Sequence, residues 1–194
     1  EDTVIESNSY LAQESKMGRR DFNKLAVGAA AILMLPPVAN ALEVVGHDVM
    51  VNTPDGDADC YFVHPAKGKH PGVIIWPDIL GLRPAFRLMG ERLAKSGYAV
   101  LVVNPYYRSA RSPVIEPGAS FQDAKTRNRV MPYYSALSAE TNVTDAKAYV
   151  SYLDAQNSVD VKRKIGTTGY CMGGPMVMRT AAAIPERIGA GGSF

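Results

Sequence analysis

Two continuous apolar runs separated by a helical pattern constrain the fold of this chain most strongly. Residues Val73–Trp76 and Tyr98–Val103 are largely apolar throughout, which is typical of strands buried on both faces of a sheet. Between them, residues 84–96 place apolar side chains at helical spacing, and Gly97 follows as a stop signal. A strand, a helix and a second strand in this order predict a right-handed crossover and a parallel sheet.

The same alternation extends over most of the chain. We predict further strands at 47–52, 58–64, 164–168 and from Ile188 onward, and further helices at 122–134, 138–156 and 174–184. The first two strands flank a turn rich in Pro, Asp and Gly, so they predict an antiparallel hairpin. The expected fold is therefore a single α/β domain, with a mostly parallel central sheet flanked by helices.

Composition excludes several classes of protein. Hydrophobic residues make up 46% and charged residues 21% of the 194, which is ordinary for a globular domain. The 21 basic and 19 acidic residues leave a net charge of +2, so we expect no nucleic-acid partner. The two cysteines form neither a disulfide framework nor a zinc-site spacing, and we expect no metal and no cofactor. No apolar run reaches the roughly 18 residues of a stable membrane span.

Residues 1–41 resemble an export signal rather than part of the fold. Arg19-Arg20 precedes the apolar stretch Leu25–Ala39, and Ala39-Asn40-Ala41 supplies small residues for cleavage. This order resembles a twin-arginine signal peptide after a polar extension, which implies the export machinery as a partner and a periplasmic protein that folds before export. The alternative is a buried helix with a basic start. The domain itself is assigned to 42–194.

The segment with the clearest chemical meaning is Gly169-Tyr170-Cys171-Met172-Gly173-Gly174. It joins a predicted strand directly to a predicted helix, which requires a tight corner with small neighbours on both sides of its tip. The tip residue, Cys171, then stands at the positive end of the helix, where the thiolate is favoured. This is the pattern of a nucleophile elbow with cysteine as the nucleophile. The alternatives are a glycine-rich dinucleotide turn, which usually follows the first strand, and an inert buried cysteine.

Three segments resemble the dienelactone hydrolase family, a cysteine branch of the α/β-hydrolases. They are the elbow, the strand and loop Val73–Leu82, and the loop Asn104–Arg108, which resembles a Tyr-x-Arg substrate loop. The resemblance covers residues 45–194. It implies an α/β-hydrolase fold and a hydrolase of small carboxylic esters or lactones.

The resemblance also implies roles for individual residues. Cys171 would be the nucleophile, and the backbone N–H groups of Met172 and Ile79 would form the oxyanion hole. Asp78 matches a family glutamate that contacts the cysteine but is one methylene shorter; the alternative is an ordinary loop carboxylate.

A substrate carboxylate would bind to Arg108 beside Tyr107, as the resemblance implies for the third segment. The alternative for Arg108 is a solvated loop arginine. Three further arginines in this half of the chain are predicted to be surface charges: Arg83, Arg87 and Arg111.

The residues after Cys171 contain no aspartate and no histidine, and all three histidines precede the elbow: His47, His64 and His70. In α/β-hydrolases the acid and the histidine follow the nucleophile. We therefore expect both to lie beyond residue 194, in C-terminal strands and helices that this sequence lacks, and we expect the 194 residues to be a fragment of the active enzyme.

Two other functions remain open at this point. A non-catalytic exported binding domain on the same scaffold would also lack a base and an acid, and a nucleotide-binding oxidoreductase would use the glycine turn. A disulfide between Cys60 and Cys171 would abolish the nucleophile, so we expect both thiols to be free.

Overall fold

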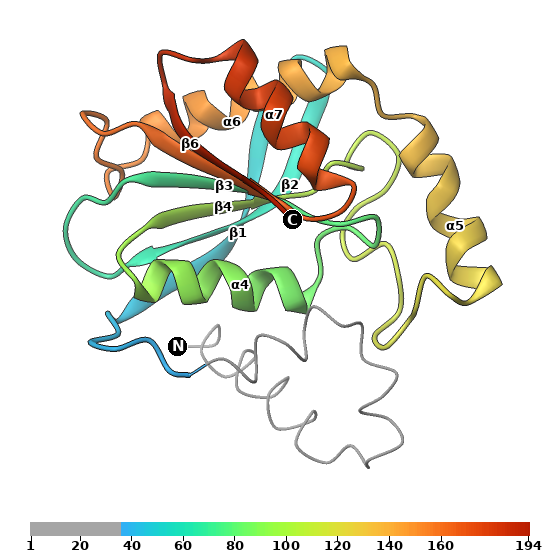
Figure 1. The fold of residues 1–194 in the computed structure, drawn as a ribbon, viewed down its shortest axis with the longest axis horizontal. Coiled ribbons are helices and arrows are strands. Elements are labelled where there is room, and N and C mark those ends of the chain that lie inside the picture. The colour runs from blue at the N-terminus through green and yellow to red at the C-terminus, as the bar shows by residue number, and fades with distance from the viewer. Residues whose placement is uncertain (1–35) are drawn as a thin grey trace.

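A computed structural model describes residues 36–194 as a six-stranded sheet flanked by helices (Figure 1). The predicted alternation is confirmed, with element ends within a few residues of those expected. The strands are β1 (Val44–Thr53), β2 (Gly56–Pro65), β3 (Gly72–Trp76), β4 (Ala99–Val103), β5 (Ile165–Gly169) and β6 (Ile188–Ser193). The helices are α4 (Pro84–Lys95), α5 (Ala124–Ser135), α6 (Ala139–Asp154) and α7 (Gly173–Ala183).

The sheet has the order β1-β2-β4-β3-β5-β6. β1 pairs antiparallel with β2, and β2 pairs antiparallel with β4. β4, β3, β5 and β6 are all parallel neighbours, so the sheet is mostly parallel with an antiparallel hairpin at its start, as predicted. Gly56 makes the hairpin turn with a φ of 124°, a conformation that suits glycine.

Alternate side chains of the central strands enter two separate cores. Val73 and Ile75 of β3 pack with the apolar face of α4, whereas Ile74 and Trp76 pack with residues of α6 and α7. Figure 1 shows α4 on one face of the sheet and α6 and α7 on the other. Burial on both faces explains why these strands are apolar at consecutive positions.

Local signals define the start of α6. The Ser138 side chain accepts the N–H of Thr141 at 3.1 Å, and the Thr141 hydroxyl accepts the N–H of Ser138 at 3.0 Å. This reciprocal pair satisfies two N–H groups that would otherwise lack partners. Beyond it, Tyr149 and Leu153 are buried against the sheet and hold the helix there.

The predicted leader, residues 1–41, lies for the most part outside the described residues, which start at 36, so its assignment stays a prediction. Among the helices of residues 36–194, none has the length and apolar character needed to cross a membrane. The same part of the chain contains no group of three or more His, Cys, Asp or Glu arranged to hold a metal ion.

The parallel strands place their carboxyl ends at one edge of the sheet. β3 ends at Trp76, β4 at Val103 and β5 at Gly169, so the loops that follow these strands meet there. In open α/β sheets this edge is where ligands bind. The three segments that resemble the hydrolase family all contribute to it.

Candidate active site

Cys171 lies at a sharp corner between the end of β5 and the start of α7. Its φ is +50°, in the left-handed region that side chains other than glycine rarely adopt. Its side chain is exposed, and its backbone N–H donates to the Phe194 carbonyl at 2.7 Å. Strand, corner and helix therefore follow one another directly, as the elbow pattern predicts, and the corner holds the residue in a strained conformation.

Two glycines allow the corner to close. A Cβ atom on Gly169 would overlap the carbonyl oxygen of Gly173, and a Cβ atom on Gly173 would overlap the carbonyl oxygen of Trp76. The first contact brings the helix against the strand, and the second brings the helix start against the end of β3. Any side chain at either position would push α7 away from the sheet.

Some backbone N–H groups around the elbow bond within the corner itself, and two others have no acceptor among the described residues. Gly173 donates to the Tyr170 carbonyl and Gly174 to the Cys171 carbonyl. Within residues 36–194, the N–H groups of Met172 and Ile79 donate to no protein acceptor. These two predicted oxyanion-hole donors are therefore free to bind an incoming negative oxygen, with the positive end of the helix behind one of them.

The Asp78 carboxylate is held by Arg83, which the sequence analysis predicted to be a surface charge. Both oxygens of this carboxylate accept from Arg83, at 2.6 and 2.8 Å, and one also accepts the Leu80 N–H at 2.9 Å. The prediction that Arg83 is a surface charge is wrong, because the loop folds back and buries it with 8% of its surface exposed, over the ring of Phe86. These contacts favour the loop-carboxylate interpretation of Asp78.

Arg108 and Tyr107 belong to a polar network that ties three parts of the chain together. The Tyr107 hydroxyl lies 2.8 Å from an oxygen of Asp145 and 2.7 Å from the Thr53 hydroxyl. The Arg108 guanidinium donates to both oxygens of Asp145 and to Asp55. Burial raises the pKa of the Asp145 carboxyl, while Arg108 and Tyr107 oppose that rise.

This network leaves the predicted substrate contacts of Arg108 and Tyr107 without support. Their polar groups already have partners in the hairpin turn and in α6, so a substrate carboxylate would have to displace Asp145 or Asp55. These contacts favour the alternative interpretation, in which Arg108 is a loop arginine bound by the protein's own carboxylates. Arg87 and Arg111 are partly exposed and pair with Asp48 and Asp59, consistent with surface charges.

No histidine of the described chain reaches the elbow. His47 lies on β1 and His64 on β2, toward the edge of the sheet that is remote from β5. Both rings pack near Phe62. His70 precedes β3, at the other end of that strand, and bonds to backbone carbonyls there. Residues 36–194 thus supply the elbow and the backbone donors but no imidazole beside Cys171.

The two thiols are free and lie in contrasting surroundings. Cys171 is exposed, whereas Cys60 is buried in β2 with 2% of its surface exposed. Burial raises the pKa of the Cys60 thiol well above its usual range, so this residue stays protonated. The absence of a bond between them agrees with the expectation from the sequence.

Tyr106 is a site residue that the sequence analysis missed. Its hydroxyl donates to the Ile79 carbonyl at 2.9 Å and lies 3.1 Å from the sulfur of Met172. It comes from the same loop that the family resemblance identified, one residue before Tyr107. The available signal was the Tyr-x-Arg pattern, because the tyrosine two residues before Arg108 is Tyr106 and not Tyr107.

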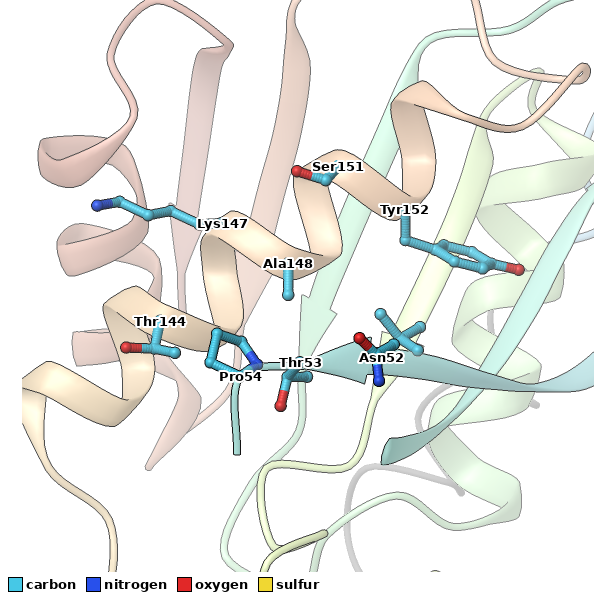
Figure 2. Close-up of a pocket in the computed structure, with 9 residues that line it drawn as sticks. Asn52, Thr53, Pro54, Thr144, Lys147, Ala148, Ser151 and Tyr152 are labelled. Atoms are coloured by element: carbon cyan, nitrogen blue, oxygen red, sulfur yellow. The ribbon is translucent and has the colours of Figure 1, made fainter. Parts of the chain in front are cut away.

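A separate open groove of about 710 Å³ lies between the β1–β2 turn and α6 (Figure 2). Asn52, Thr53 and Pro54 line one side, and Ala148 and Tyr152 are among the α6 residues on the other. None of the elbow or oxyanion-hole residues contributes to it. The groove is therefore distinct from the candidate active site.

Comparison with known proteins agrees with this geometry. The model of the dienelactone hydrolase family matches residues 58–194. A carboxymethylenebutenolidase from Pseudomonas putida is 30% identical over 118 residues, covering 61% of this chain and 48% of that protein. A putative carboxymethylenebutenolidase from Synechocystis is 32% identical over 127 residues, covering 64% of this chain and 48% of that protein.

Solved structures show the same fold. A putative dienelactone hydrolase from Klebsiella pneumoniae superposes with a TM-score of 0.63 at 21% identity, covering 76% of this chain and 58% of the other. An α/β-hydrolase from Penicillium gives 0.57 at 18% identity, covering 77% and 45%. The fold is that of the α/β-hydrolases, and the chain belongs to the dienelactone hydrolase family. It spans about half the length of the curated relatives named above.

The glycine contacts make a specific prediction about stability. Gly169→Ala forces a methyl group into the Gly173 carbonyl, so we expect the free energy of unfolding to fall by about 3 kcal/mol. Gly166→Ala, on the same strand, meets only Val73 at an ordinary 3.6 Å, and we expect a change within about 1 kcal/mol. Urea unfolding of both variants measures the difference, and equal stabilities would contradict the close packing at the corner.

Proposed function

We propose that this protein hydrolyses small carboxylic esters or lactones, with Cys171 as the nucleophile. The observation that carries the proposal is the exposed thiol at a positive-φ corner, beside two backbone N–H groups without protein acceptors in residues 36–194. The names of the related carboxymethylenebutenolidases support a lactone or ester as substrate. No cofactor enters the proposed reaction.

The proposed reaction proceeds through a thioester. The Cys171 thiolate adds to the carbonyl carbon, and the carbonyl oxygen takes up the negative charge and accepts hydrogen bonds from the Met172 and Ile79 N–H groups. The carbon–oxygen bond to the alcohol then breaks, and the leaving oxygen takes a proton. Water adds to the resulting thioester, which releases the acid and restores the thiol. With a lactone, alcohol and acid remain parts of one product.

Residues 36–194 provide only part of this machinery. They supply the nucleophile and the oxyanion donors, whereas the proton transfers need a base that this part of the chain does not place at Cys171. The leaving group of an activated ester needs no proton. We therefore expect these residues to be able to form the thioester from such an ester. A non-catalytic binding domain would not form it selectively.

Incubation with p-nitrophenyl acetate tests this step directly. We expect release of about one equivalent of p-nitrophenol per chain and a single acetyl group on Cys171, located by peptide mass spectrometry. Cys171→Ala should abolish both signals, because no other described thiol is exposed.

Cys60→Ala is the matched control, since it removes the buried thiol and should leave the acetylation of Cys171 unchanged. Acetylation confined to lysines, or equal p-nitrophenol release from Cys171→Ala, would reject the cysteine hydrolase and favour a scaffold without catalysis.

We also propose that residues 1–41 direct export through the twin-arginine route. The support is the order of Arg19-Arg20, the apolar stretch and the small residues at 39–41. Export of a folded protein would keep both thiols in their folded surroundings before they meet an oxidising compartment.

Replacing both arginines by lysine, Arg19→Lys with Arg20→Lys, should abolish delivery to the periplasm while leaving the amount of protein unchanged. Fractionation of cells that produce the two forms measures this. An unaltered periplasmic fraction for the double variant would contradict the twin-arginine assignment. Lys16→Arg, which exchanges the same two residue types outside the motif, is the control and should leave delivery unchanged.

A further inference from the structure

A single buried hydroxyl connects the two backbone segments of the proposed oxyanion hole. Tyr106 follows β4 and has 1% of its surface exposed. Its phenol oxygen donates to the Ile79 carbonyl at 2.9 Å and lies 3.1 Å from the Met172 sulfur, a weak acceptor. One side chain therefore contacts both residues whose N–H groups would bind the oxyanion.

Several hydrogen bonds fix the turn that carries Ile79. The Ile79 N–H and the Asp78 carbonyl belong to one peptide group. That carbonyl accepts the Gly81 N–H at 2.9 Å. The next peptide is held at both ends, because Asp78 accepts its Leu80 N–H and Tyr106 donates to its Ile79 carbonyl. Of these bonds, only that of Tyr106 comes from outside the turn.

Hydrogen bonds and a ring contact hold Tyr106 itself in place. The Asn104 side-chain oxygen accepts the Tyr106 N–H at 3.0 Å, and the Asn104 amide donates to Asp59 and to the Ala110 carbonyl. Asn104 is fully buried. The ring of Tyr106 packs 5.7 Å from that of Tyr133 on α5. Contacts from the loop after β4, from β2 and from α5 therefore help to set the position of the hydroxyl.

We propose that Tyr106 is a positioning residue that keeps the Ile79 and Met172 donors at the spacing an oxyanion requires, an inference that rests on the hydrolytic function proposed above. Without its hydroxyl, the Ile79–Leu80 peptide loses the bond that fixes its orientation relative to α7. The N–H donors would then be present but less well aimed, and small misplacements are costly in such sites.

The electrostatic surroundings keep Tyr106 in its donor form. Burial raises the pKa of the phenol, and the negative charges of Asp78 and of a Cys171 thiolate add to the rise. The phenol therefore remains protonated through the physiological pH range, and its hydroxyl is available as a donor to the Ile79 carbonyl whenever the thiolate forms.

A ratio of two reactions at Cys171 tests this role. Acylation by p-nitrophenyl acetate develops an oxyanion, whereas alkylation by iodoacetamide displaces iodide from a saturated carbon and develops none. Both need the same thiolate, so the ratio of their rates at one pH cancels the fraction ionised. The wild-type ratio should exceed that of a synthetic peptide containing residues 167–175, which has the thiol without the fold.

Tyr106→Phe should lower this ratio about tenfold, with the alkylation rate unchanged. Tyr107→Phe is the matched control, because it also removes a buried hydroxyl but one that bonds to Thr53 and Asp145, and its ratio should equal that of wild type. Should Tyr106→Phe fail to fold, Met172→Leu keeps the N–H and removes the sulfur, and should lower the ratio about twofold.

The possible outcomes distinguish failure of the Tyr106 positioning role from failure of the proposed hydrolytic function. An unchanged ratio in Tyr106→Phe, or in Met172→Leu as its replacement, overturns the positioning role while a high wild-type ratio preserves the proposed hydrolase. An equal fall of acylation and alkylation in Tyr106→Phe also overturns it, since that would show a disturbed elbow. A wild-type ratio no higher than that of the peptide overturns the hydrolytic function, and the inference with it.

Discussion

The contact between the start of α7 and the end of β3 is the constraint on which the rest of the site depends. Gly173 lies so close to the Trp76 carbonyl, and Gly169 to the Gly173 carbonyl, that neither position has space for a side chain. This closeness forces the chain to turn within three residues, places Cys171 at a positive φ and aims the first turn of α7 across the edge of the sheet. The strain at Cys171 is balanced by the buried β3–β5 pairing on one side and by α7 packing on the other.

The second half of the site depends on a loop that is rigid for different reasons. After β3 the chain makes a short turn held by its own carboxylate, by a buried arginine and by a tyrosine from the neighbouring strand end: Asp78, Arg83 and Tyr106. A donor such as the Ile79 N–H contributes to catalysis only when it is already oriented as the negative charge forms. In the reaction proposed above, the polar contacts of this loop would make a reactive thiol selective for carbonyl groups.

Much of this architecture was predictable because it follows from local patterns. The buried strands have consecutive apolar residues, α6 has a capping signal at Ser138, and the glycines around Cys171 identify the corner. The arginines whose surroundings the sequence did not reveal are those with partners far away in the sequence or brought near by a loop that reverses direction. Arg83 is buried only because its loop reverses, and Arg108 is engaged because Asp55 and Asp145 converge on it from the hairpin and from α6. Composition and spacing do not show which distant residues will meet. Tyr106 is a different case, because the spacing of the Tyr-x-Arg pattern already favoured it over Tyr107.

In the proposed reaction, an oxygen bonded to the carbon attacked by Cys171 lies between the N–H groups of Met172 and Ile79. A crystal structure of the chain after reaction with a trifluoromethyl ketone measures this, because the thiol adds to the ketone to give a tetrahedral adduct with a negative oxygen. We predict a bond from the Cys171 sulfur to that carbon, with the oxygen about 2.7–3.1 Å from the nitrogens of both Met172 and Ile79. An adduct oxygen directed to solvent, with neither nitrogen in reach, would contradict it.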